Sequence, residues 1–148
     1  MQTVTIHTRL ITNVGGQTEK IQNTFKGTWG IRDNRHLLSY NEADNGGPTH
    51  VLFDMVQAEL RRMGQVRSRM TFAERERISS CYITPHGTLP MQIHTHRYQA
   101  AMSEMGGRLE VSYALFLAGS HVSDNKLLIE WEVLKHIPTW EVLFVCTS

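Results

Sequence analysis

The sequence has too few cysteines for a disulfide framework. Only Cys81 and Cys146 occur in 148 residues, and they lack the C-x-x-C spacing of a metal or redox site. This usage fits a reducing, cytoplasmic setting. No apolar run approaches the roughly 18 residues of a membrane-spanning helix, and the N-terminus lacks the charged and apolar regions of a signal peptide. We therefore expect a cytoplasmic protein without a membrane partner.

An excess of charge of one sign is also missing. Fifteen Lys and Arg residues stand against fourteen Asp and Glu residues, which gives a formal net charge of +1. A dedicated nucleic-acid-binding domain usually concentrates basic charge, whereas the basic group that includes Arg61 and Arg69 is followed closely by Glu74 and Glu76. We expect no nucleic-acid partner. The length, with 41% hydrophobic residues, suits one globular domain with its own core.

Local motifs of catalysis are absent as well. The sequence contains no Gly-x-Ser-x-Gly nucleophile elbow, no glycine-rich phosphate loop and no His-Glu-x-x-His helix. Cys81 has His86 nearby in the sequence, but a lone structural thiol is the simpler interpretation than a catalytic pair. We favour a protein that is not an enzyme and has no cofactor. A site assembled across several strands would leave no local motif, so the question stays open at this stage.

Apolar and polar residues alternate with a period of two along nearly the whole chain, which is typical of β-strands. Turn sequences such as Gly15-Gly16 and Asp33-Asn34 separate about nine or ten such segments. Short connections force neighbouring strands to be antiparallel, and closure of the sheet removes its exposed edges. Residues 55–65 also suit a helix. The sequence predicts an all-β protein, a single up-and-down antiparallel β-barrel of about eight to ten strands.

Several segments together resemble one known family. They are residues 27–40, Arg62-Met63-Gly64 with Met70-Thr71-Phe72, Tyr82-x-Thr84-Pro85-x-Gly87-x-Leu89, and Gly106-Gly107-Arg108-Leu109. In combination they resemble the YwiB-like family of small bacterial proteins, over residues 5–133. The resemblance implies a calycin-type barrel, similar to lipocalins and fatty-acid-binding proteins, and a bacterial cytoplasmic origin, but no activity. We expect the barrel over residues 1–136 and an apolar extension over 137–148, suited to an extra strand, a mobile tail or a homodimer contact.

The alternation also assigns an inward face to each strand. Most of the expected inward side chains are large and apolar, among them Trp29, Phe72 and Trp131. The polar residues on the same faces are Arg62, Ser68, Ser80, Tyr82, Thr84, Thr95 and Arg97. The glutamates are assigned to the outer faces; they are Glu42, Glu59, Glu110, Glu130 and Glu132. No carboxylate is therefore expected beside Arg62, although an unpaired buried charge is costly.

Two interpretations of Arg62 follow. A guanidinium suits carboxylates and phosphates, so Arg62, supported by Ser80, Tyr82 and Thr95, would hold the head of a small amphiphilic anion in an apolar lumen. Alternatively, Arg62 extends to solvent beside the turn at Gly64 while large residues fill the barrel. The protein would then be a structural or interaction module that uses its outer surface or C-terminal segment. We favour the ligand-binding module.

His94 and His96 are the remaining candidates for special chemistry. Residues two apart on a strand share a face, so both imidazoles could reach one metal ion. A third ligand cannot be placed, and both histidines are assigned to the outer face with Gln92 and Tyr98, where imidazoles are usually solvated. We expect no bound metal.

Overall fold

The computed structural model describes residues 1–134, so the expected extension at 137–148 lies outside the described residues. Its strands are β1 (Gln2–Val14), β2 (Gln17–Arg32), β3 (Arg35–Glu42), β4 (Gly47–Phe53), β5 (Gln57–Met63), β6 (Arg67–Ala73), β7 (Arg77–Thr84), β8 (Gly87–Ser103), β9 (Gly106–Leu117) and β10 (Ser120–Val133). A single 3-10 turn, η1 (Ala43–Asn45), lies between β3 and β4. Short turns make the other connections, as the alternating pattern predicts.

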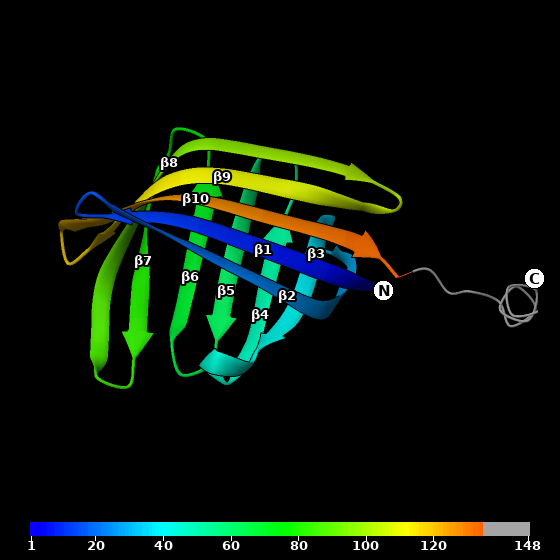
Figure 1. Cartoon of the computed structure of the whole chain (residues 1–148), viewed down its shortest axis with the longest axis horizontal. Coiled ribbons are helices and arrows are strands. Elements are labelled where there is room, and N and C mark those ends of the chain that lie inside the picture. Colours follow the sequence, from blue (N-terminus) through cyan, green and yellow to red (C-terminus); the bar gives the residue numbers. More distant parts are fainter. Residues whose placement is uncertain (135–148) are drawn as a thin grey trace, which may run out of the picture.

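Every strand pairs antiparallel with its neighbours in the sequence, and β1 also pairs with β10, which closes the barrel. In Figure 1 the long strands β8, β9, β10 and β1 run across the view, while β4 to β7 stand steeply against them. The predicted all-β, up-and-down antiparallel barrel is confirmed, with ten strands. Residues 57–63 of the ambiguous segment form β5 rather than a helix. Across the described residues, no helix has the length and apolar character needed to cross a membrane.

The barrel wall is incomplete in two places. β2 pairs with β3 only over residues 27–32, so residues 17–26 pair with β1 on one side and with no strand of the described chain on the other. β6 and β7 pair only at Arg67 with Ile83 and at Ser68 with Tyr82, and they separate toward their connecting turn. The separation of β2 from β3 leaves the interior open to solvent on this side.

Aromatic side chains fill the interior at the end where β1 begins and β10 ends. The ring centroids of Trp29 and Trp131 are 5.7 Å apart in an edge-to-face arrangement, and Trp131 lies 5.1 Å from Phe53. His36 stacks on Phe53 and accepts a hydrogen bond at Nδ1 from Trp29 Nε1 at 3.2 Å. We call these four residues the aromatic cluster; it closes this end of the barrel.

An irregularity in β8 reverses the faces expected for the residues that follow it. A β-bulge interrupts the pairing of β8 with β9 between Thr95 and Arg97. The extra residue shifts the alternation, because two residues of the bulged strand face one of its partner. Tyr98 is consequently buried and Arg97 exposed, so the predictions of an outward Tyr98 and an inward Arg97 are wrong.

Candidate functional site

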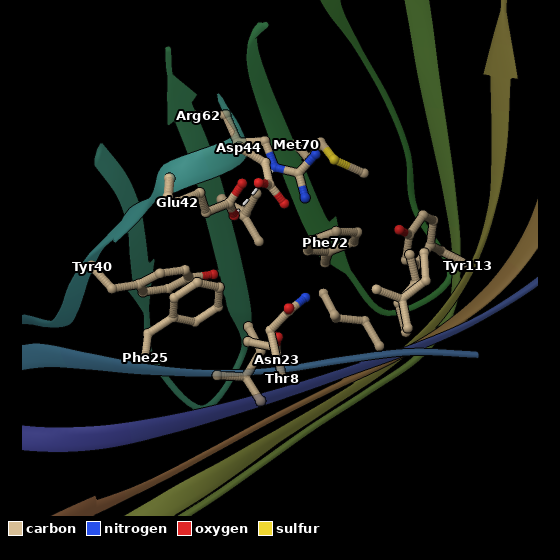
Figure 2. Close-up of a pocket in the computed structure, with 16 residues that line it drawn as sticks. Thr8, Asn23, Phe25, Tyr40, Glu42, Asp44, Arg62, Met70, Phe72 and Tyr113 are labelled. Carbon is tan, nitrogen blue, oxygen red and sulfur yellow. Dashed lines mark ion pairs between the residues drawn. The ribbon is translucent and has the colours of Figure 1, made fainter. Parts of the chain in front are cut away.

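Away from the aromatic cluster the barrel contains a cavity of about 420 Å³. Its wall comes from β1, β2, β3, η1, β5, β6, β9 and β10, and it is mostly apolar, with Leu60, Phe72 and Leu127 among the lining side chains. Ile21 and Asn23 of β2 lie on one side and Asp44 of η1 on another, so the cavity opens where β2 and β3 part. Figure 2 shows the polar side chains gathered around this apolar interior.

Arg62 lies in this cavity with a carboxylate beside it. Its Nε is 3.7 Å from Glu42 Oε1, and the side chain of Arg62 is 41% exposed whereas that of Glu42 is 18% exposed. The buried Nε makes no hydrogen bond within residues 1–134. The assignment of Glu42 to an outer face is wrong, because β3 continues its inward alternation from Leu38 through Tyr40 to Glu42. An acidic group therefore compensates Arg62 inside the barrel.

Two buried tyrosines present hydroxyl groups to the same space. Tyr40 is 6% exposed and Tyr113 is 5% exposed, and Figure 2 shows both hydroxyls directed into the cavity. Burial raises the pKa of Tyr113 to about 12, against the opposing effect of Arg62. Burial and then Glu42 raise the pKa of Tyr40, with Arg62 again opposing. Both phenols are therefore neutral at physiological pH and able to donate or accept a hydrogen bond.

The structure brings only one of the four sequence-predicted site residues into this cavity. Arg62 lines it, whereas Ser80, Tyr82 and Thr95 do not. Arg62 pairs with Ser68, which pairs in turn with Tyr82, so one residue separates Tyr82 from Arg62 on the inward face. Thr95 is buried without a hydrogen-bond partner for Oγ1 among the described residues, and Ser80 is half-buried on β7. Ligand contact by these three residues stays a prediction.

Sequence reasoning missed Tyr40, Glu42 and Asp44 as members of the site. The signal for Glu42 was present, since it lies at the same spacing from Tyr40 as Tyr40 does from Leu38. Carboxylate side chains are mostly exposed in folded proteins, so residue type alone favours an outward position for Glu42. Asp44 lies in η1, where strand alternation gives no direction for a side chain.

Of the two outer histidines of β8, His94 has local partners. His94 Nε2 lies 2.7 Å from Gln92 Oε1, and its ring centroid is 4.3 Å from that of Phe116. Within the described part of the chain, no three His, Cys, Asp or Glu side chains are grouped so that they could hold a metal ion. His96 is exposed in the β8 bulge.

These features define a closed antiparallel β-barrel with a cavity whose mouth is polar. The chain belongs to the family described as Domain of unknown function (DUF1934), which matches residues 4–129. It is similar to the uncharacterised β-barrel protein YwiB of Bacillus subtilis (strain 168), with 21% identity over 131 residues, covering 87% of this chain and 92% of that protein. The resemblance stated from the motifs is confirmed.

The crystal structure of the ywiB protein from Bacillus subtilis superposes on this chain with a TM-score of 0.82 at 22% identity, covering 90% of this chain and 93% of that one. This likeness shows that the barrel fold is shared. The family description names no activity.

Proposed function

We propose that the protein binds a small amphiphilic molecule in the barrel cavity. A volume of about 420 Å³ falls within the range of about 300–1,000 Å³ common for small-molecule sites. An apolar wall with a few polar groups at one end is the usual form of such a site. The apolar body would lie against Leu60, Phe72 and Leu127, and the polar end would lie near Arg62 at the mouth.

The observation that carries the proposal is the pair of tyrosine hydroxyls that face the cavity. The Tyr40 and Tyr113 residues are 6% and 5% exposed, both line the cavity, and neither hydroxyl bonds another group of residues 1–134. An apolar space with a few convergent polar groups suits a ligand that has both apolar and hydrogen-bonding parts. A ligand in the cavity would take the place of water at these two hydroxyls.

We extend the proposal to a lipocalin-like role, in which the barrel holds one ligand, because small barrels have room for a single small molecule. We also propose a cytoplasmic location. Cys81 is an exposed free thiol, and such thiols persist in reducing compartments. The packed-barrel alternative is supported by the aromatic cluster, which fills one end only. The cavity at the other end favours binding.

The test uses N-phenyl-1-naphthylamine, an uncharged fluorescent amphiphile whose emission rises in an apolar site. We expect the natural protein to enhance its fluorescence saturably and Met70→Trp to abolish the enhancement, because Met70 lines the cavity. Met63→Trp is the matched control, since Met63 is 46% exposed on β5 outside the cavity. No saturable enhancement by the natural protein, or equal loss in both folded variants, would overturn the proposal.

Native mass spectrometry of protein purified from its own host supplies a second readout. A bound mass that disappears after denaturation would identify the natural ligand, and we expect the Met70→Trp variant to lose it while Met63→Trp retains it. Retention of that mass by Met70→Trp would place the ligand elsewhere on the protein.

A further inference from the structure

The charged side chains around the cavity do not balance. Among the described residues that line it, Arg62 supplies one positive charge while Glu42 and Asp44 supply two negative charges. Glu42 is the carboxylate that faces Arg62, with 3.7 Å between Oε1 and Nε. Asp44 forms no ion pair within residues 1–134. The mouth of the cavity therefore carries one uncompensated negative charge.

The strand beside the mouth does not offset this charge. Successive side chains of a strand point to opposite faces, so Lys20 and Lys26 of β2 lie on the outer face, opposite Ile21 and Asn23. Glu19 shares the inward face with Ile21. It lies two residues closer to the start of β2, where it pairs with Thr12. Charges on the inward face of this edge are therefore acidic.

Aromatic rings complete the mouth. Phe25 and Tyr40 stack with their centroids 4.6 Å apart and an interplanar angle of 25°, and both line the cavity. The faces of aromatic rings attract cations, and a neutral phenol can accept a hydrogen bond from an ammonium group. Figure 2 shows Tyr40 and Phe25 beneath Glu42 and Asp44, so rings and carboxylates border the same part of the space.

We infer that the ligand is an amphiphilic cation, an ammonium group on an apolar body, with the charged head between Asp44, Glu42 and the Phe25–Tyr40 pair. This inference rests on the proposed function and adds the sign of the ligand's charge. An anion at Arg62, which the sequence alone suggested, has to compete with the Glu42 carboxylate and meets the repulsion of Asp44. A cation meets two carboxylates and one guanidinium, and its binding neutralises the mouth.

The test compares octylammonium, octanoate and octanol, three probes with one apolar body and different heads, by isothermal titration calorimetry at neutral pH and low salt. We expect octylammonium to bind at least about tenfold more tightly than octanoate, with octanol between them, because an ammonium group at contact distance from the half-buried Glu42 and the exposed Asp44 is attracted to both carboxylates. Asp44→Asn should remove most of this preference. Asp33→Asn, which changes an exposed turn residue, is the matched control and should leave the preference intact.

The substitution Arg62→Gln is a second test of the sign of the ligand's charge. It should tighten octylammonium binding, because it removes the one cation at the mouth, whereas an anion site would lose octanoate binding. Tighter binding of octanoate, equal binding of the three probes, or an unchanged preference in Asp44→Asn would overturn the inference and leave cavity binding standing. Failure of all three probes together with N-phenyl-1-naphthylamine would overturn the proposed function itself.

Discussion

At the scale of single residues, the hydroxyl of Tyr98 connects parts of the chain far apart in sequence. It donates to the carbonyl oxygen of Asp54 at 2.7 Å and also lies 3.2 Å from that of Gln57. Asp54 lies in the turn between β4 and β5, and Gln57 is the first residue of β5. The β8 bulge turns Tyr98 inward, and its hydroxyl then connects β8 to the β4–β5 region across the barrel.

We predict that Tyr98→Phe lowers the free energy of unfolding by about 1–2 kcal/mol, since it removes the donor from two partly buried carbonyls. Urea denaturation followed by circular dichroism measures the change. Tyr82→Phe is the control, because the Tyr82 hydroxyl makes no hydrogen bond within residues 1–134 and the side chain is half-buried. Equal effects of the two substitutions would show that the Tyr98 hydrogen bonds contribute nothing to stability.

At the scale of elements, β2 has two glycines in different surroundings. A Cβ at Gly27 would collide with the Ser39 carbonyl oxygen and lie 2.7 Å from Ile6 Cδ1. A Cβ at Gly30 would meet only Met1, with 3.5 Å to the nearest atom. Gly27 therefore permits the close approach of β1, β2 and β3 just where β2 and β3 begin to part.

Gly27→Ala should accordingly destabilise the protein by about 1–3 kcal/mol through overpacking. Gly30→Ala, the same change three residues along the strand, should be neutral or stabilising by up to about 1 kcal/mol, because alanine loses less conformational entropy in a strand. Thermal and urea unfolding of the two variants provide the comparison. A Gly30→Ala variant as unstable as Gly27→Ala would contradict the close approach.

The elements also show what the sequence can and cannot predict. Period-two alternation and short turns predict the strands, the barrel and the inward position of Arg62, because both signals are local. The β8 bulge at Thr95 has no local signal, so the alternation beyond it was assigned to the wrong faces. The cavity is not predictable from one strand either, since its size depends on how side chains from eight elements fill the interior. Asp44 enters the site only through that assembly, whereas Glu42 follows the inward alternation of β3 through Leu38 and Tyr40.

At the scale of the whole molecule, the two ends of the barrel differ in packing. Phe53 is fully buried in the aromatic cluster, whereas Phe25 is half-buried and lines the cavity. Removal of a ring from a packed core leaves a new void and loses its contacts. Removal of a ring beside an existing cavity loses fewer contacts and leaves space that water already reaches.

We therefore predict that Phe53→Ala lowers the free energy of unfolding by about 3–5 kcal/mol and that Phe25→Ala lowers it by less than half as much. Urea unfolding curves of both variants measure the difference, and the fluorescence of N-phenyl-1-naphthylamine reports the cavity. Phe25→Ala should alter probe binding while the fold persists. Comparable losses of stability in the two variants would show that the hollow end supports the fold as strongly as the aromatic cluster does.

The aromatic cluster packs one end of the barrel with side chains that do not line the cavity. Substitutions around the cavity can therefore change its shape and charge while the filled end continues to stabilise the fold. The barrel shared with a structure of 22% identity, at a TM-score of 0.82, shows that this architecture persists when most side chains differ. One architecture can accordingly carry different cavity linings.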